Sequence, residues 1–473
     1  MAKPIMIMGC TSDAGKSFLV TALCRHFANQ GVQVAPFKAQ NMSNNAAVTA
    51  EGLEIGRAQY LQALAARTTP QARMNPVLLK PSAETYSQVI VLGKFSPEIT
   101  ALPWLERRNR LWPVVRAALH SLLDDYEQVV IEGAGSPAEV NLRASDIVNM
   151  AVALECQADV YLVADIDRGG SFAHLLGTWA CLEPPEQALI KGFVLNKFRG
   201  DPRLLGNAMS WLQARTGIPT VAIIPMIDHA LPEEDALHHR AAPVEEQINI
   251  ALIAYPYASN LDEFDPLIHE PGVTLVPVRE LERLDRYHAV ILPGSKNTVE
   301  SLRHLRQTGL AAEISRAAQR GIPILGICGG LQMLGQQICD PGHLEGGDMP
   351  GLGLLDVTTT LLPEKVTAQR EAHIVSGDVG GGVVRGYEIH HGQTQAGLNV
   401  RAHLEAGLGW QQGNVWGVYL HGLLENTAYR QQFLARLGWR GQTRDWQAYL
   451  DEQLERVAAL IPASGWFASK DTG

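Results

Sequence analysis

One cysteine stands in a sequence context that is typical of a nucleophile. The run Gly326-Ile-Cys328-Gly-Gly330 is the cysteine version of the G-x-S-x-G turn between a strand and a helix. Its glycines let the chain turn sharply and lift the side chain out of the sheet, and the free N–H groups at a helix N-terminus favour the thiolate. A free cysteine is more often a small core residue. Because glycines flank this one on both sides, we interpret Cys328 as a nucleophile for acyl transfer.

A cysteine nucleophile needs a general base, and the chain offers two candidate positions for it. His421 ends the apolar run Trp416 to Leu420 and is followed by a glycine, whereas His390 and His391 are adjacent in a second segment. His421 also stands at the place where the glutamine amidotransferases, which this segment resembles, keep their catalytic imidazole. We therefore predict that His421 is the base, and that His390 and His391 help to form the site.

A second reactive stretch lies near the N-terminus. The run Gly9-Cys-Thr-Ser-Asp-Ala-Gly15-Lys16-Ser17 follows a predicted strand, precedes the helical run Phe18 to Asn29, and has one residue more than the standard phosphate-binding loop. The backbone amides from Thr11 to Gly15 would surround phosphates, Lys16 would neutralise their oxygens and Ser17 would hold Mg²⁺. This pattern predicts a nucleotide-binding site.

Polar side chains follow several later strands, where open α/β sheets bind their ligands. Glu132 ends the strand Gln128 to Ile131, and Asp165 and Asp167 follow the strand Asp159 to Ala164. We interpret the carboxylates of Asp165 and Asp167 as metal ligands, with capping of a loop by solvated acids as the alternative.

The segment from Phe37 to Asn45 contains one lysine and four side-chain amides. Such a segment could be a solvated loop, but its position beside the expected γ-phosphate favours a surface for a large polar substrate. We predict Lys38 as a second cation near the phosphate. The predicted substrate-binding residues are Gln40, Asn41, Asn44, Arg57 and Gln59.

The elements that must position these residues indicate an α/β protein with two domains, because 473 residues exceed one hydrophobic core. We expect an ATP-binding domain at 1–230, a linker at 231–247, a second α/β domain at 248–440 and a helical tail at 441–473. The tail has apolar residues at three-to-four-residue spacing, and we expect its helix to pack on the second domain. The predicted strands are Pro4 to Met8, Gln128 to Ile131, Asp159 to Ala164, Lys191 to Leu195, Thr220 to Ile224, Ile248 to Ala254, Val273 to Val278, His288 to Leu292 and Ile322 to Ile327.

Bulk composition excludes several classes of protein. A formal net charge of −10 argues against a nucleic-acid partner, and no apolar run is long enough for a membrane span. The N-terminus enters a strand directly, so we expect no signal peptide. Six scattered cysteines fit a reducing cytoplasm without structural zinc. The sequence gives no oligomeric state.

The motifs resemble known families. The cysteine elbow resembles the class I glutamine amidotransferases, which release ammonia from glutamine, and this resemblance implies a flavodoxin-like sheet with an oxyanion hole at Gly294 and Gly329. The phosphate loop is similar to that of dethiobiotin synthetase, which implies a parallel P-loop NTPase-like sheet. That resemblance also implies that Glu132 is a magnesium ligand and that Asn196 reads adenine.

The chain as a whole resembles the cobyric acid synthase family. The resemblance rests on the phosphate loop, the run Lys38 to Asn45, the run Met74 to Pro81, the Glu132-Gly-Ala-Gly motif and the loop Pro293 to Thr298. It implies amidation of the b, d, e and g carboxylates of adenosylcobyrinic acid a,c-diamide, with ATP, Mg²⁺ and glutamine. One departure is that position 423 is Leu where many amidotransferases have Glu, so we predict a Cys-His dyad without an identified third group.

Two alternatives stay open at this point. The related cobyrinic acid a,c-diamide synthase has the same two modules and acts on an earlier corrinoid. A non-enzymatic nucleotide switch would keep the phosphate loop and use the second domain as a scaffold, but the paired Cys328 and His421 argue against it.

Overall fold

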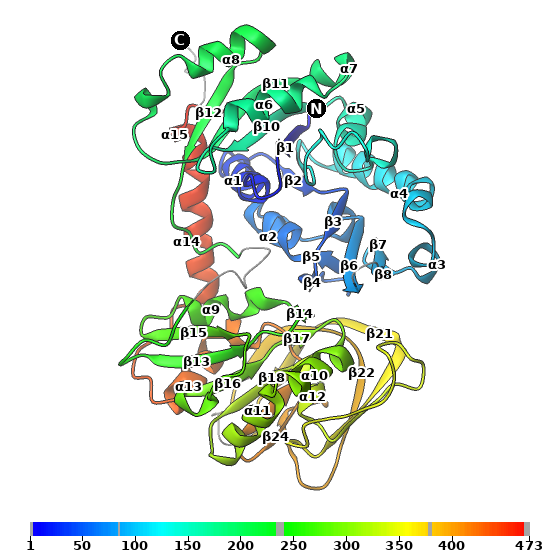
Figure 1. The fold of residues 1–473 in the computed structure, drawn as a ribbon, viewed down its shortest axis with the longest axis vertical. Coiled ribbons are helices and arrows are strands. Elements are labelled where there is room, and N and C mark those ends of the chain that lie inside the picture. The colour runs from blue at the N-terminus through cyan, green and yellow to red at the C-terminus, as the bar shows by residue number, and fades with distance from the viewer. Residues whose placement is uncertain (1–2, 84–85, 233–240, 377–380, 468–473) are drawn as a thin grey trace.

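The computed structural model describes residues 3–83, 86–232, 241–376 and 381–467. Two α/β units lie one above the other, the first formed by the N-terminal half and the second by the C-terminal half (Figure 1). Each is built on a mostly parallel sheet with helices against it. The prediction of two α/β domains is confirmed.

The first sheet has six parallel strands in the order β12-β11-β10-β1-β9-β2. Its strands are apolar runs because both faces are covered, as in other parallel sheets. Every residue of β1 and of β9 is buried. The strands are β1 (Ile5–Gly9), β2 (Val34–Phe37), β9 (Gln128–Glu132), β10 (Asp159–Asp165), β11 (Ile190–Phe198) and β12 (Thr220–Pro225). The carboxyl ends of β1, β9, β10 and β11 therefore bring the phosphate loop, Glu132, Asp165 and Asn196 to one edge.

Helices cover both faces of this sheet. The helix after the phosphate loop, α1, is the predicted one and starts at Lys16. The helices of the first domain are α1 (Lys16–Asn29), α2 (Arg57–Ala65), α3 (Pro97–Thr100), α4 (Trp104–Asp125), α5 (Met150–Cys156), α6 (Ser171–Ala180), α7 (Pro184–Gln187) and α8 (Ala208–Thr216).

In the amide-rich segment, Phe37 ends β2 and Gln40–Met42 forms a short strand, whereas Ser43 to Asn45 lie outside strands. This strand and the short strands that follow it belong to two small sheets between the main sheet and the second domain (Figure 1). One sheet has the order β3-β6-β7-β8, with β3 (Gln40–Met42), β6 (Val77–Ala83), β7 (Tyr86–Val91) and β8 (Lys94–Phe95). The other pairs β4 (Ala46–Val48) with β5 (Glu54–Gly56).

The second domain has a seven-stranded sheet in the order β15-β13-β16-β18-β25-β24-β23. The first five of these strands are parallel, and β24 and β23 are antiparallel additions. The strands are β13 (Ile248–Ile253), β15 (Val273–Val278), β16 (Ala289–Leu292), β18 (Ile324–Ile327), β23 (Arg401–Leu404), β24 (Gly409–Gln412) and β25 (Val415–Val418).

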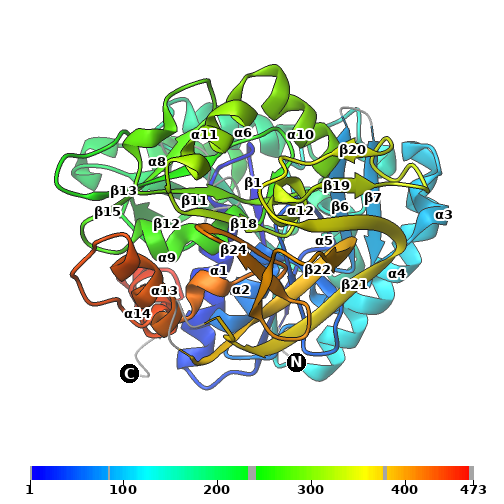
Figure 2. The same ribbon diagram turned by 90° about the horizontal axis from the view of Figure 1, so that it is seen from below.

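A long antiparallel hairpin of β21 (Val357–His373) and β22 (Val383–Ala396) extends from this domain (Figure 2). It was not predicted, and it carries contacts to the first domain. The remaining strands of the second domain are β14 (Ala258–Ser259), β17 (Gly294–Ser295), β19 (Gln337–Cys339) and β20 (Met349–Pro350). Its helices are α9 (Asp265–Ile268), α10 (Thr298–Gln307), α11 (Leu310–Gln319), α12 (Gly329–Leu334) and α13 (Thr427–Arg436).

The tail helix α14 (Trp446–Ala458) corrects one prediction, since it packs mainly on the first domain. Leu450 and Leu454 belong to the same buried cluster as the α1 residue Leu23. The buried guanidinium of Arg25 on α1 pairs with Asp451 at 2.7 Å. Apolar spacing shows that a helix has a face to bury but not which domain covers it, so the predicted packing on the second domain was wrong. A last short helix is α15 (Leu460–Ala463).

The remaining sequence predictions concern single features. Residues 233–240 of the predicted linker lie outside the described residues. No helix in the described part of the chain combines the length and the apolar character needed to cross a membrane. All six cysteines are unpaired.

Candidate functional site

The turn at Cys328 has the geometry of a nucleophile elbow. Strand β18 ends at Ile327, and α12 begins at Gly329, with Cys328 at φ 51° and ψ −104° between them. A Cβ built on Gly330 would lie 2.1 Å from the carbonyl oxygen of Leu292, and one built on Gly326 would lie 2.6 Å from Gly330. Both positions therefore require glycine, and the strained cysteine backbone is held by packing on either side.

The imidazole beside this elbow belongs to His421, and a carboxylate orients it. Nδ1 of His421 lies 2.9 Å from Oε1 of Glu263, whose second oxygen accepts a hydrogen bond of 3.0 Å from the Gly422 N–H. The ring of Tyr387 stacks on the imidazole with centroids 5.2 Å apart. The predicted dyad was wrong, because the third group comes from a short 3₁₀ helix (Leu261–Phe264) far earlier in the chain. No spacing rule relates Glu263 to His421, so the sequence pattern could not reveal it.

The surroundings of His421 keep its imidazole protonated. Burial alone would lower its pKa, but the charge of Glu263 and the contact with the Cys328 sulfur raise the pKa to about 10. An imidazolium next to a thiol favours the thiolate form, which is the reactive nucleophile. The three side chains thus have the arrangement of a Cys-His-Glu triad.

Replacing Glu263 by Gln is expected to lower glutaminase activity by about a hundredfold or more, because the orienting charge is lost. The raised pKa of His421 stabilises the folded protein fully below its ordinary value of 6.5, and this stabilisation is lost as the pH rises through about 10. Urea unfolding of the wild type should therefore show a decline over that range that the variant lacks. An equal decline in both proteins, with unchanged glutaminase activity, would contradict the role of Glu263; Glu280→Gln at an exposed site is the control.

A cavity of about 650 Å³ opens at the Cys328 sulfur. The predicted oxyanion residues converge here: a Cβ on Gly329 would lie 2.7 Å from the Ser295 nitrogen, and one on Gly294 would lie 3.1 Å from His421 Cε1. The charged and polar side chains that line the cavity are Gln88, Ser295, Lys296, Asn297, Thr298, Glu300, Arg303, Gln332, His343, Glu345, Lys365, His390 and His391. The cavity therefore has both positively and negatively charged side chains in the wall that also contains the Cys328 nucleophile.

The ionisable groups of this cavity are strongly perturbed. Burial raises the pKa of Glu345 to about 7, although its carboxylate accepts hydrogen bonds from the Thr298 and Val299 N–H groups. Burial and the charge of Lys365 lower the pKa of His391 to about 4, so this ring is neutral. His390 is held by Glu388 at 2.9 Å and stacks on Tyr419. Both histidines form walls of the cavity, as expected, and neither replaces His421.

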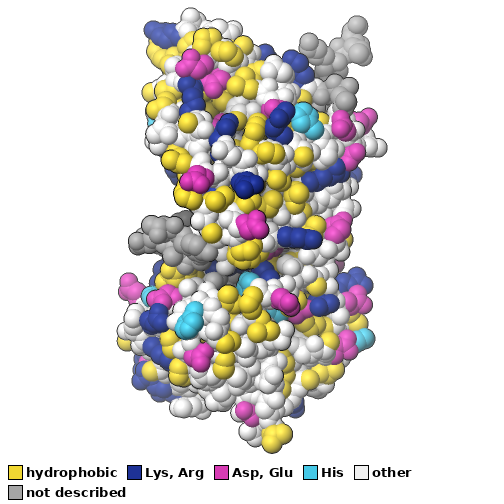
Figure 3. All heavy atoms as spheres, turned by 90° about the vertical axis from the view of Figure 1, so that its right-hand side faces the viewer, with side chains coloured by type: hydrophobic (Ala, Val, Ile, Leu, Met, Phe, Trp, Pro, Cys, Tyr) yellow, Lys and Arg dark blue, Asp and Glu magenta, His cyan; other side chains and the backbone are white. Residues whose placement is uncertain are grey.

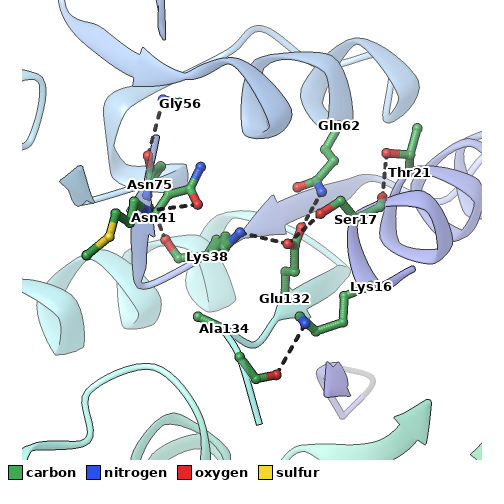
Figure 4. Close-up of polar contacts among 12 residues, drawn as sticks. Lys16, Ser17, Thr21, Lys38, Asn41, Gly56, Gln62, Asn75, Glu132 and Ala134 are labelled. Carbon is green, nitrogen blue, oxygen red and sulfur yellow. Dashed lines mark hydrogen bonds and ion pairs between the residues drawn. The ribbon is translucent and has the colours of Figure 1, made fainter. Parts of the chain in front are cut away.

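The phosphate loop in the first domain forms the second site (Figure 4). Lys16 Nζ donates to the carbonyl oxygens of Gly135 at 3.2 Å and Thr11 at 3.4 Å. The Ser17 hydroxyl donates to Oε1 of Glu132 at 2.8 Å. The loop, its lysine and the carboxylate at the end of β9 therefore meet at one point, where phosphate oxygens would be bound.

Glu132 is fully buried in a cluster with Lys38 and Gln62 (Figure 4). Lys38 Nζ lies 2.8 Å from Oε1, and Gln62 Nε2 donates to Oε2 at 2.6 Å. Burial opposes ionisation of Glu132, but the Lys38 charge and the hydrogen bonds lower its pKa below the ordinary value. Lys38 and the Ser17 hydroxyl thus contact the same oxygen of Glu132, and Gln62 on α2 is a member of the cluster that the sequence did not reveal.

The other residues predicted near ATP lie around this point. Asn196 donates to the Ala14 carbonyl at 2.9 Å, and a Cβ on Gly15 would lie 2.0 Å from the Asn196 amide, so the Asn196 side chain packs directly against the phosphate loop. Asp165 pairs with Lys197 at 2.9 Å and Asp167 with Arg199 at 3.1 Å. These two carboxylates are bound by cations and do not join Glu132.

The residues predicted to bind substrate divide into two groups. Gln40 lines an open cavity of about 580 Å³ beside Gly135. Asn41 and Gln59 are buried. The guanidinium of Arg57 is bound by Asp262 at 2.5 Å and by Glu425 at 2.9 Å, both in the second domain. Arg57 therefore joins the two domains and does not face the open cavity.

Further contacts make this interface continuous. Lys365 of the hairpin lies 2.6 Å from Oε2 of Glu54, and the buried Lys80 pairs with the other oxygen. Burial lowers the pKa of both lysines. The Tyr387 hydroxyl donates to the Ala46 carbonyl at 3.0 Å. An apolar cluster lies between the domains and contains Ala46, Val48, Leu78, Ile90, Tyr387 and Ile389. Asn44, the last of the residues predicted to bind substrate, lies in the amide-rich segment directly before Asn45 and Ala46.

Family models match both halves of the chain. Residues 5–238 match the CobQ/CobB/MinD/ParA nucleotide binding domain, and residues 249–429 match the CobB/CobQ-like glutamine amidotransferase domain. These two ranges agree with the two sites, since the first contains the phosphate loop and the second contains the elbow and its histidine.

Curated relatives match along nearly the full length. Cobyric acid synthase of Deinococcus radiodurans is 56% identical over 474 residues, which cover 97% of this chain and 98% of the relative. That of Albidiferax ferrireducens is 53% identical over 485 residues, with 97% of each chain covered. That of Variovorax paradoxus is 52% identical, with 90% of this chain and 91% of the relative covered. With both domains, both sites and this identity along the whole length, the chain belongs to the cobyric acid synthase family.

Proposed function

We propose that this protein is a glutamine-dependent amide synthase that converts carboxylates of a corrinoid to amides with ATP. The observation that carries the proposal is the presence of a Cys328-His421-Glu263 centre and a phosphate site in one chain, joined by a buried interface. Membership of the cobyric acid synthase family supports a corrinoid as the substrate. The proposed acceptors are the b, d, e and g carboxylates of adenosylcobyrinic acid a,c-diamide.

The glutamine half of the reaction follows from the elbow geometry. The Cys328 thiolate attacks the side-chain amide carbon, the His421 imidazolium protonates the leaving nitrogen, and the thioester formed is hydrolysed by water to glutamate. N–H groups near Gly294 and Gly329 would stabilise the tetrahedral oxyanion. Glu345 is suited to the α-ammonium group of glutamine, and Lys296 and Lys365 to its α-carboxylate. Ammonia is the product carried forward.

In the ATP-dependent half-reaction the substrate carboxylate must first be activated, because a carboxylate is a poor acceptor for ammonia. A substrate carboxylate oxygen attacks the γ-phosphorus, ADP leaves, and ammonia then displaces phosphate from the acyl phosphate. Lys16, Lys38 and the loop amides would stabilise the charge on the transferred phosphoryl group. The Ser17 hydroxyl and the Glu132 carboxylate are adjacent hard oxygen donors and fit Mg²⁺, which would neutralise phosphate charge when bound.

The open cavity beside Gly135 is the proposed corrinoid site. Its wall combines apolar side chains such as Trp104, Leu111 and Leu142 with Arg107, Arg108 and Arg143. On the face that carries α3 and α4, hydrophobic, basic and acidic side chains lie interspersed (Figure 3). A corrin ring has apolar faces and carboxylates at its rim, and this mixture of side chains suits both.

Replacing Arg108 by Leu is expected to raise the KM for the corrinoid about tenfold, because one guanidinium for the rim carboxylates is lost. Glutaminase activity should stay unchanged, since the cysteine centre lies in the other domain. Steady-state kinetics with varied corrinoid measures the effect. Arg110→Leu, on the same helix but not in the cavity wall, is the matched control. Equal kinetics for the two variants would argue against this cavity as the corrinoid site.

Product mass tests the proposed function and separates it from the nearest alternative. Purified protein should be incubated with ATP, Mg²⁺ and glutamine, and with either the a,c-diamide or cobyrinic acid. The proposal predicts four new amides on the diamide. Two new amides on cobyrinic acid, with no reaction of the diamide, would identify an a,c-diamide synthase.

A further inference from the structure

The guanidinium of Arg57, on the first domain, contacts both chain segments that carry the acid and the base of the glutaminase centre. Its Nε lies 2.5 Å from Asp262, which directly precedes Glu263 in a short 3₁₀ helix. Its Nη2 lies 2.9 Å from Glu425, which ends the 3₁₀ helix that follows His421 in the chain. One side chain of the first domain therefore ties together the segments that position two members of the triad in the second.

The first domain also holds the start of the 3₁₀ helix that carries Glu263. Asn260, the residue before this helix, is buried and has a left-handed backbone at φ 56° and ψ 42°. Its N–H donates to Oδ1 of Asn45 at 2.7 Å, and its side-chain oxygen accepts from the Ala46 N–H at 3.0 Å. Because this backbone conformation is uncommon for residues other than glycine, the two bonds from the first domain help to fix the turn from which the helix starts.

The acids around this centre depend on Arg57 for their counter-charge. In the part of the chain that the structure describes, Arg57 is the only cation that forms an ion pair with Asp262 or Glu425. Burial raises the pKa of Glu425, and the charge of Arg57 opposes this rise. The negative charges of Asp262 and Glu263 lie close enough to raise the same pKa further. Since a buried carboxylate without a partner is costly, loss of Arg57 would leave three repelling acids and displace Glu263.

Resting on the proposed function, we propose that Arg57 is a positioning residue of the glutaminase centre, which holds Glu263 against His421 from the other domain. Asn45 supports the same segment through its hydrogen bond to the turn before it. A guanidinium suits this role, because its planar fork can pair with two carboxylates at once, whereas the ammonium of a lysine is a single point charge. Arg57 does not line the cavity at Cys328, so it acts on the reaction through the acids that it binds.

Two other residues of the first domain make it possible to separate positioning from simple docking of the domains. Gln88 and Phe95 belong to the wall of the cavity at Cys328. If a substitution moved the domains apart, the cavity would lose this part of its wall and the KM for glutamine would rise. A substitution that only misplaces Glu263 leaves the wall intact and lowers kcat. The two kinetic constants therefore report on the two effects separately.

Arg57→Met should lower the kcat of glutamine hydrolysis by about tenfold and leave the KM for glutamine within about twofold of the wild type. Asp262→Asn should have a similar effect, because it removes the acid that Arg57 binds next to Glu263. The double variant should be no slower than the slower single variant, since two residues that act through one contact are not additive. The measurement is the initial rate of glutamate release at varied glutamine, with ATP and the corrinoid present.

Asn45→Ala tests the second support without leaving a charge unpaired. It removes the acceptor of the Asn260 N–H and should lower kcat by about threefold at an unchanged KM. This variant decides the question if Arg57→Met does not fold. Arg73→Met is the matched control, since the Arg73 guanidinium pairs with Asp125 at 2.6 Å within the first domain. The control should hydrolyse glutamine like the wild type.

Three results would overturn the positioning role. One is an unchanged kcat in both Arg57→Met and Asn45→Ala. Another is a raised KM for glutamine at constant kcat, which would show that Arg57 only keeps the domains together. The third is a double variant whose loss equals the product of the single losses, because Arg57 would then not act through Asp262. A wild-type protein that releases no glutamate would instead refute the proposed function, and the positioning role with it.

Discussion

Cys328→Ala is expected to reduce glutamine-dependent amidation by more than about 10⁴-fold, as removal of the nucleophile does in related triads. The thiolate is the only group at the elbow that can form the thioester, and His421 and Glu263 act through it. Amidation with ammonium should stay within about twofold of the wild type, because the phosphate site belongs to the other domain. Coupled ADP release, measured with each nitrogen source, gives both numbers.

Cys339→Ala is the matched control, since this thiol lies on β19 and does not line the cavity. The control should use glutamine like the wild type. If Cys328→Ala retained substantial glutamine use, the assignment of the nucleophile would be wrong. A loss of activity with ammonium as well would mean that the substitution disturbs the whole protein.

Lys16→Met should have the second large effect. It should impair the half-reaction that Cys328→Ala spares, which is ATP-dependent amidation, and spare the half-reaction that Cys328→Ala abolishes, which is glutamine hydrolysis. Its ammonium group is placed on the Gly135 and Thr11 carbonyls at the phosphate loop, and a thioether cannot stabilise charge on a transferred phosphoryl group. Amidation should fall by about 10³-fold or more with both glutamine and ammonium. Glutamate release should persist, because the cysteine centre is intact.

Lys191→Met, at an exposed position of β11, is the control for the loss of one positive charge. Isothermal titration of ATP should show weaker binding to Lys16→Met and unchanged binding to the control. Retention of ammonium-dependent amidation in Lys16→Met would refute the phosphate loop as the activating site.

The features that the sequence predicted correctly depend on local physics. Strands such as β1 and β10 are apolar on both faces because both faces are covered, so their pattern alone locates them. The elbow at Cys328 and the loop at Gly15 need glycine for steric reasons that leave a signature in the sequence. Since strand ends carry the ligands in such folds, the order of motifs along the chain is enough to bring Lys16, Ser17 and Glu132 together.

The features that the sequence missed depend on contacts between distant segments. Glu263 reaches His421 from another segment of its domain, and no periodicity links them. Arg57 carries a charge that could equally bind a substrate carboxylate, and only the position of Asp262 decides against that. The apolar stripe of α14 fits either domain, and the ion pair between Arg25 and Asp451 shows which domain it covers.

Transfer of labelled nitrogen is the most direct test of how the two sites work together. The wild type should be given glutamine labelled with ¹⁵N in its side-chain amide, together with ATP, the a,c-diamide and an excess of unlabelled ammonium at neutral pH. The proposed synthase should place ¹⁵N in all four new amides, as read by mass spectrometry of the product. Unlabelled amides in proportion to the free ammonium would contradict a buried transfer of nitrogen from Cys328 to the phosphate site.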